Sequence, residues 1–341
     1  MKIANFNLDE DILIVAEIGN NHEGSLRLAE RLIGLAAQSG ADAVKFQTIV
    51  PSRLVSSKQK ERLRQLEKFR LSYKEFEKLS KVAKHEGVLF LSTPLDIESA
   101  RFLNKLVPAF KIASADNNFF PLIETIAKTG KPIILSSGLA TIDEIEAAAN
   151  FIERVWRRNG VRQELAVLHC VTSYPVRPDE ANLLAIKTLR ERLKMTIGYS
   201  DHTIGIDAAV LSVALGARII EKHFTIDKNY SDFRDHKLSA DPHDFKKLVK
   251  KIRGASKMLG DGIKRPQKSE TDIARTLRRS IVARRDLKKG KMLGDHEIAW
   301  ARAEAGLSIG QESQLMGRFL SRAVKRGEPI LPCDTYGKSK R

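Results

Sequence analysis

The sequence predicts an α/β fold, a (β/α)8 TIM barrel followed by a small β-rich domain. From Asp11 to about Leu259, short runs of β-branched residues alternate with longer stretches of helical period, as in repeated βα units around a parallel sheet. Eight such units can be counted, and eight strands in about 250 residues fit a closed barrel better than an open sheet. After Pro266 the pattern changes to short strand-like pieces separated by glycines.

The eight apolar, β-branched runs place the strands in chain order at residues 12–17, 43–47, 88–92, 110–113, 132–136, 165–169, 195–200 and 218–223. The stretches of helical period between them predict helices at residues 26–38, 73–85, 97–106, 121–128, 142–157, 183–193, 206–215 and 242–259. Ser72 and Thr141 support two of the helix starts, because each precedes a glutamate by three residues, the pattern of a capping box.

These elements divide the chain into a catalytic barrel over residues 1–262, a linker over 263–276 and a C-terminal domain over 277–341.

Hydrophobic residues make up 42% and charged residues 30% of the chain, a globular composition that excludes disorder, collagen and coiled coil. The apolar runs fall far short of the roughly 20 residues that span a bilayer, so no membrane partner is expected. The start of the chain lacks the pattern of a secretory signal, and Cys170 and Cys333 are the only cysteines, so a reducing, cytoplasmic location is expected.

The formal net charge is +17, which raises the question of an anionic substrate or a nucleic acid. The excess is regional, because residues 244–291 hold 17 basic and 5 acidic residues. A solvated helix face and loop explain this stretch best, since no aromatic residues interleave with the basic ones as a single-strand platform requires. We therefore expect no nucleic-acid partner, and a basic nucleic-acid-binding protein is the non-enzyme alternative.

Two lysines lie in predicted strands where a barrel carries its reactive groups, near the carboxyl ends. Lys45 and Lys111 are each flanked by apolar residues, and a buried ammonium is costly unless an anion meets it. We interpret them as a clamp for an anionic substrate. Pairing with Glu17 or Glu221 is one alternative, and a Schiff-base nucleophile in an aldolase is another. Hydroxyl-bearing turns favour the clamp, because small side chains and open amides wrap a phosphate; they contain Ser114, Ser136 and Ser200.

Two histidines close the seventh and eighth predicted strands, which are neighbours in a barrel. The imidazoles of His202 and His223 could therefore share one divalent ion and leave positions open for water and substrate. Hydrogen-bonded rim histidines are the alternative. Glu17 and Glu221 end strands at the same mouth and are candidates for orienting a hydroxyl or for proton transfer.

Seven motifs at these strand ends resemble the sialic acid synthase family. They occupy residues 16–24, 44–47, 92–94, 110–114, 134–138, 199–203 and 221–225, in order along the chain. Residues 286–290 and 298–302 resemble the antifreeze-like (SAF) domain that ends the chains of this family. The likeness covers nearly the whole sequence.

This resemblance implies a transferase of the N-acetylneuraminate synthase type, which condenses phosphoenolpyruvate with the open-chain aldehyde of an N-acylated amino sugar. The products would be a nine-carbon 2-keto acid and phosphate. It implies that Glu17, Glu221, His202 and His223 are catalytic, the two histidines through a divalent ion, Mn2+ in the first place and Mg2+ or Co2+ as alternatives. It implies substrate binding by Lys45, Gln47, Thr93, Lys111, Ser114, Ser136, Thr172, Tyr174, Ser200, Asp235 and Arg302.

The resemblance also implies a domain-swapped homodimer, in which Arg302 reaches the sugar in the partner subunit's barrel. The sequence departs from the commoner family pattern on the sugar side, at residues 301–306, at Thr172 and in the stretch 233–242, which lacks the commoner Gly-Pro-Asp-His start. The acceptor is accordingly expected to be N-acetylmannosamine or a diacetamido-dideoxy hexose that leads to legionaminic or pseudaminic acid.

Overall fold

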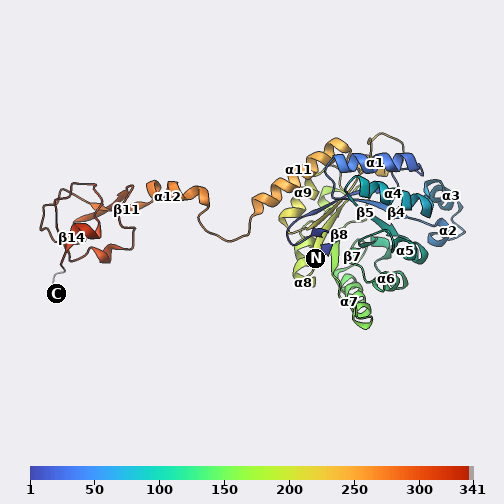
Figure 1. The fold of residues 1–341 in the computed structure, drawn as a ribbon, viewed down its shortest axis with the longest axis horizontal. Coiled ribbons are helices and arrows are strands. Elements are labelled where there is room, and N and C mark those ends of the chain that lie inside the picture. Colours follow the sequence, from blue (N-terminus) through green and yellow to red (C-terminus); the bar gives the residue numbers. More distant parts are fainter. Residues whose placement is uncertain (338–341) are drawn as a thin grey trace. The chain divides into compact units, whose positions relative to one another are not determined.

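The computed structural model of the protein describes residues 1–337 and contains two compact units (Figure 1). The first unit is Met1–Gly260, and the second begins at Asp261. The last four residues of the C-terminal domain predicted over 277–341 lie outside the described part. None of the described helices is both long and apolar enough to cross a membrane.

Eight parallel strands form the centre of the first unit. They pair in the order β5-β4-β3-β10-β9-β8-β7-β6, and β5 and β6, at the two ends of this order, lie against each other and complete the ring. The predicted (β/α)8 barrel is therefore confirmed. The strands are β3 (Leu13–Gly19), β4 (Ala43–Thr48), β5 (Leu89–Pro94), β6 (Phe110–Ile112), β7 (Ile133–Ser136), β8 (Leu165–Cys170), β9 (Thr196–Asp201) and β10 (Ile219–His223).

A main helix follows each strand and covers the outside of the ring (Figure 1). Both predicted capping boxes form: the hydroxyls of Ser72 and Thr141 accept from the third residue of α4 and α7, whose glutamates bond back. The helices are α1 (Leu26–Gln38), α4 (Tyr73–His85), α5 (Ile97–Leu103), α6 (Phe120–Ala127), α7 (Ile142–Arg158), α8 (Ala185–Leu193), α9 (Asp207–Ala214) and α11 (Pro242–Leu259).

Several short elements were not predicted from the sequence. A hairpin of β1 (Lys2–Ile3) and β2 (Phe6–Asn7) precedes the barrel, and α10 (Asp235–Leu238) follows β10. Two further helices, α2 (Pro51–Leu54) and α3 (Lys60–Phe69), lie between β4 and α4. Two-residue strands and four-residue helices are too short to leave a periodic pattern, and α3 buries only Leu66 and Phe69.

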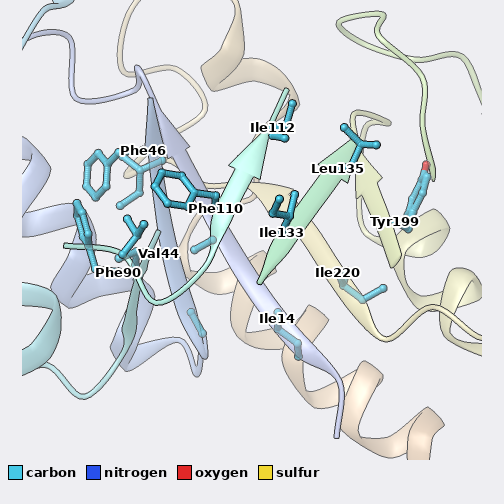
Figure 2. Close-up of a cluster of buried hydrophobic side chains, with 14 of the residues drawn as sticks. Ile14, Val44, Phe46, Phe90, Phe110, Ile112, Ile133, Leu135, Tyr199 and Ile220 are labelled. Carbon is cyan, nitrogen blue, oxygen red and sulfur yellow. The ribbon is translucent and has the colours of Figure 1, made fainter. Parts of the chain in front are cut away.

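The core has two layers because side chains alternate between the two faces of each strand. One set points outward and packs against the helices, as the labelled Ile14, Phe46 and Phe110 do in Figure 2. The other set forms a smaller cluster inside the ring and against the N-terminal hairpin; its members are Met1, Ile3, Leu8, Leu13, Val15, Ala43, Leu91, Ala109, Ile134, Ala166, Leu168 and Ile219. Toward the carboxyl end of the strands, the face that points into the ring carries polar side chains. In β3, for example, Leu13 and Val15 are followed on this face by Glu17. The carboxyl end of the ring is therefore polar.

The second unit is a small β-rich domain, as predicted. β11 (Arg279–Ala283) pairs antiparallel with β12 (Ile298–Arg302), and β13 (Phe319–Leu320) pairs with β14 (Thr335–Tyr336). Its own core includes Ile281, Leu293, Ile298, Leu315, Leu320 and Ile330. A short helix, α12 (Thr271–Leu277), lies in the segment that was expected to be a linker.

Candidate active site

A cavity of about 620 Å3 opens at the carboxyl ends of the barrel strands. All the predicted site residues of the barrel line it: Glu17, Lys45, Gln47, Thr93, Lys111, Ser114, Ser136, Thr172, Tyr174, Ser200, His202, Glu221, His223 and Asp235. Arg302 is exposed on β12 in the second unit. The barrel residues thus meet in one place, although they come from positions up to 218 residues apart in the chain.

Lys45 is surrounded by acceptors at the centre of the cavity. Its Nζ lies 2.7 Å from Oε2 of Glu17 and 3.7 Å from Oε2 of Glu221, and it donates to Thr93 Oγ1 at 3.2 Å. Burial alone would lower the pKa of Lys45, but the two glutamates outweigh it and raise the pKa above its usual value. Lys45 is therefore a charged ammonium whose nearest partner is already a carboxylate.

The positive charge of Lys111 is farther from a carboxylate than that of Lys45. Its Nζ donates to Ser136 Oγ at 2.5 Å and to the carbonyl of Ile112 at 3.3 Å, and its closest carboxylate oxygen, on Glu221, is 3.9 Å away. Burial lowers the pKa of Lys111, since Glu221 offsets only part of the loss of water. An ammonium held mainly by neutral oxygens retains the capacity to bind an anion.

The two glutamates at the mouth are in different electrostatic environments. Burial raises the pKa of Glu17 against the attraction of Lys45. Burial acts the same way on Glu221, but Lys111 and Lys45 together hold its pKa below the usual value, and Ser200 donates to it at 2.9 Å. Glu221 is therefore the better candidate for an ionised carboxylate that takes up a proton.

The imidazoles of His202 and His223 lie side by side, with ring centroids 5.4 Å apart. Nδ1 of His202 donates to the carbonyl of Val171 at 2.8 Å, which fixes its tautomer and leaves Nε2 for another ligand. Burial, together with His202, holds the pKa of His223 well below its usual value, so this ring is neutral. Its buried Nδ1 has no hydrogen-bond partner within residues 1–337.

A divalent ion fits this pair of rings. Neutral imidazole nitrogens are the form that binds metal, and two protein ligands leave open positions for water and substrate. His223 is in this form, whereas Cys170 and the carbonyl of Val171 outweigh burial and raise the pKa of His202, so a bound metal would have to compete with a proton there. No cluster of three or more His, Cys, Asp or Glu side chains that could hold a metal occurs in the described part of the chain.

One wall of the cavity is formed by the loops after β8 and β10. The ring of Tyr174 packs 4.2 Å from that of His202, and the guanidinium of Arg234 lies over it at 5.1 Å. Arg234 also pairs with Asp235 at 3.3 Å. Oγ1 of Thr172 is buried without a hydrogen-bond partner among the described residues, as expected of a group that awaits a ligand.

Sequence reasoning missed part of the cavity wall. One group of residues comes from α3. This helix follows β4, and no pattern at a strand end indicates that it lies at the cavity. Another group comes from the loop before Asp235. Asn20 lies in the motif over residues 16–24 and Cys170 is the last residue of β8, so their positions at strand ends could have indicated both. The missed lining residues include Asn20, Arg62, Gln65, Leu66, Phe69, Cys170 and Asp232, whereas Phe233 and Arg234 lie in the segment that the sequence had placed near the acceptor.

The fold and the site define a barrel enzyme whose mouth combines two buried ammonium groups with two adjacent imidazoles. Residues 32–264 match the NeuB family, and residues 278–334 match the SAF domain. The chain belongs to the NeuB family and is a transferase of the N-acetylneuraminate synthase type.

Characterised relatives include the N,N'-diacetyllegionaminic acid synthase of Campylobacter jejuni, which is 41% identical over 93% of this chain and 98% of its own length. The pseudaminic acid synthase of the same species is 35% identical over 97% of this chain and 98% of its own. Among solved structures, the N-acetylneuraminic acid synthetase of Leptospira borgpetersenii is 36% identical, covering 81% of this chain and 96% of that one, with a TM-score of 0.76.

Proposed function

We propose that this protein condenses phosphoenolpyruvate with the open-chain aldehyde of an N-acylated amino sugar, giving a nine-carbon 2-keto acid and phosphate. The observation that carries the proposal is that Lys45, Lys111, His202 and His223 line one cavity. Phosphoenolpyruvate carries a carboxylate and a phosphate, and the ammonium groups supply charge for both. The named synthases of legionaminic, pseudaminic and N-acetylneuraminic acid among its relatives support this choice.

The phosphate and carboxylate of phosphoenolpyruvate are assigned to the Lys111 side of the cavity. Lys111 has no carboxylate closer than 3.9 Å among the described residues, whereas Lys45 already has one at 2.7 Å. The hydroxyls of Ser114, Ser136 and Ser200 line the same cavity and would share in holding the donor. This anchoring positions the enol carbon toward the sugar and lowers the entropic part of the barrier.

Proton handling is assigned to Glu221. Its carboxylate receives a hydrogen bond from Ser200 and lies near both lysines, so it is ionised at neutral pH. After the carbon-carbon bond forms, water adds at C2 of the donor; Glu221 would take the proton of that water, and the tetrahedral centre then expels phosphate. The lysines would stabilise the negative charge on the departing phosphate.

The acceptor would lie between β3 and the loops after β8 and β10. Glu17, Gln47 and Asp235 offer acceptors and a donor for sugar hydroxyls, and Thr93, Thr172 and Tyr174 complete the pocket. His202 and His223 would hold a divalent ion, Mn2+ in the first place and Mg2+ or Co2+ as alternatives, which acts as a Lewis acid toward the aldehyde oxygen. The 41% identity with a legionaminic acid synthase favours a diacetamido-dideoxy hexose over N-acetylmannosamine.

A panel of acceptor sugars, with phosphate release as the readout, tests this function. Purified protein, phosphoenolpyruvate and Mn2+ should release phosphate only when a suitable N-acylated amino sugar is present, and a chelator should stop the reaction. A Schiff-base aldolase is the alternative, since burial lowers the pKa of Lys111 toward that of a nucleophilic amine. Borohydride reduction in the presence of substrate would then trap an adduct on Lys45 or Lys111.

A further inference from the structure

A buried ion pair lies directly behind the two histidines and takes no part in the reaction described above. Nζ of Lys222 is 2.9 Å from Oδ2 of Asp201, and the two side chains are 1% and 0% exposed. The residues are direct partners in the register of β10 and β9. Neither lines the cavity, whereas their neighbours Ser200, His202, Glu221 and His223 do. The pair therefore lies on the outer face of these strands.

Both carboxylate oxygens of Asp201 have partners. Oδ1 accepts from the backbone N–H of Thr203 at 2.9 Å, from its hydroxyl at 2.8 Å and from the hydroxyl of Tyr199 at 3.2 Å. Lys222 also donates to the carbonyl of Thr203. These contacts join the residues on both sides of His202 to the residue that immediately precedes His223.

His202 needs such support because it lies just beyond the end of β9 at Asp201. Its own carbonyl accepts from the N–H of Val176 at 3.0 Å, and its ring bonds to the carbonyl of Val171; both partners belong to the loop after β8. The Asp201–Lys222 pair is a side-chain connection between the end of β9 and the residue before His223, in addition to the pairing of the two strands.

Stability alone gives little reason for the pair. Removing two charges from water is expensive, and well-packed apolar side chains of similar size are often as stable or more stable in the same position. Outer groups that orient metal-binding histidines, in contrast, commonly change metal affinity by 10- to 100-fold when they are altered.

We propose that the Lys222–Asp201 ion pair is a positioning element that sets the relative placement of His202 and His223, so that the affinity for the divalent ion depends on it. This inference rests on the metal site of the proposed function. Neither Lys222 nor Asp201 lines the cavity, so both would act through the histidines.

The test uses the full-length protein and the double variant Lys222→Met/Asp201→Asn. This variant removes both charges at once, so that no uncompensated charge stays buried, and the amide oxygen of the substituted side chain can still accept from Thr203. The control is Arg253→Met/Asp42→Asn. It removes an ion pair in which Nη2 of Arg253 lies 2.6 Å from Oδ1 of Asp42, the residue before β4, at the amino end of the strands. Thermal unfolding and circular dichroism verify that each variant is folded.

The readout is Mn2+ binding by titration calorimetry without substrates, followed by the Mn2+ dependence of phosphate release. We expect a Kd for Mn2+ at least tenfold weaker in the Lys222/Asp201 variant, with turnover largely restored at saturating Mn2+, and an unchanged Kd in the control. An unchanged Kd in both variants would overturn the positioning role and leave the proposed function intact. A wild-type protein that binds no divalent ion would overturn the metal site and this inference with it.

If the double variant does not fold, the single variant Asp201→Asn serves instead. It keeps the shape of the side chain and leaves the acceptor for Thr203 in place. The same tenfold weakening of Mn2+ binding is expected, and wild-type affinity in a folded Asp201→Asn protein would contradict the proposal.

Discussion

The backbone N–H of Gly138 donates to Oγ of Ser114 at 3.2 Å, across the loops that follow β7 and β6. The position leaves no room for a side chain: a Cβ on Gly138 would overlap Oγ1 of Thr172 and lie 2.7 Å from Oγ of Ser114. A side chain at this position would therefore displace Ser114 and Thr172, which both line the cavity. This backbone holds the hydroxyl of Ser114, which we propose shares in binding the phosphate.

Gly138→Ala should accordingly displace Ser114 and Thr172 and lower kcat/KM by at least tenfold. The matched control is Gly254→Ala in α11, where a Cβ meets no atom within 4 Å. That substitution should raise the free energy of unfolding by up to about 1 kcal/mol, because alanine has the higher helix propensity, and leave kcat/KM unchanged. Steady-state kinetics and denaturant unfolding check both. Full activity in a folded Gly138→Ala protein would show that the loops can separate at no cost to the site.

Lys111→Met should raise the KM for phosphoenolpyruvate by at least tenfold, and much more than the KM for the sugar. The reason is that Lys111 is held mainly by Ser136 and the Ile112 carbonyl, so its charge is available to the donor. Lys128→Met, which removes an exposed lysine paired with Glu124, is the control and should change neither constant. The opposite pattern, a selective rise in the KM for the sugar, would contradict the assignment of the donor to this side.

The barrel should become less stable as the pH is lowered, because of His22. This ring is 1% exposed, and burial lowers its pKa from 6.5 to about 4. Between these values the unfolded chain binds a proton that the folded chain does not, so the free energy of unfolding decreases as the pH falls from 6.5 to 4. The loss amounts to about 3 kcal/mol at most.

His22→Asn should flatten this part of the pH profile, since an amide oxygen can replace Nδ1 as acceptor for the N–H of Gly24. Unfolding midpoints measured across this pH range in His22→Asn, in wild type and in the exposed control His243→Asn provide the comparison. Parallel profiles for wild type and His22→Asn would show that His22 does not cause the effect.

The proposed domain-swapped dimer makes a prediction about Arg302. If Arg302 serves the barrel of the partner subunit, co-expression of Arg302→Ala and Lys111→Met chains creates mixed dimers with one intact site. Random pairing would then give about a quarter of wild-type activity, well above either variant alone. Purification through two different tags isolates the mixed dimers. Activity no higher than that of the separate variants, or a monomer by light scattering, would leave Arg302 without this role.

The fold could be predicted from the sequence because each barrel strand and each main helix has its own local signal. The bounds of α1, α4 and α11 agree with the predicted ones, since Ser25, Ser72 and Asp241 accept hydrogen bonds from the backbone at the three starts. The rule that places reactive groups at the carboxyl ends of barrel strands then brings distant motifs together. Lys45 and Glu221 meet in this way, although the sequence separates them widely.

The pairing of the lysines could not be decided from the sequence, and the structure supports two of the competing interpretations at once. Lys45 is paired with a barrel glutamate, whereas Lys111 is largely free of one. The difference between the two lysines depends on how side chains from several strands are placed relative to one another. No local sequence pattern predicts that placement. The same holds for Arg62 and Gln65, because their helix α3 reaches the mouth through the packing of Leu66 and Phe69.

The central claim is that this cavity cleaves the C–O bond of phosphoenolpyruvate after water adds at C2. Phosphoenolpyruvate labelled with 18O in the bridging position, incubated with the protein, Mn2+ and the acceptor sugar, tests it most directly by mass analysis of both products. We predict that the label is found in the released phosphate. Label retained in the nine-carbon keto acid would mean that the P–O bond breaks, and would contradict the account.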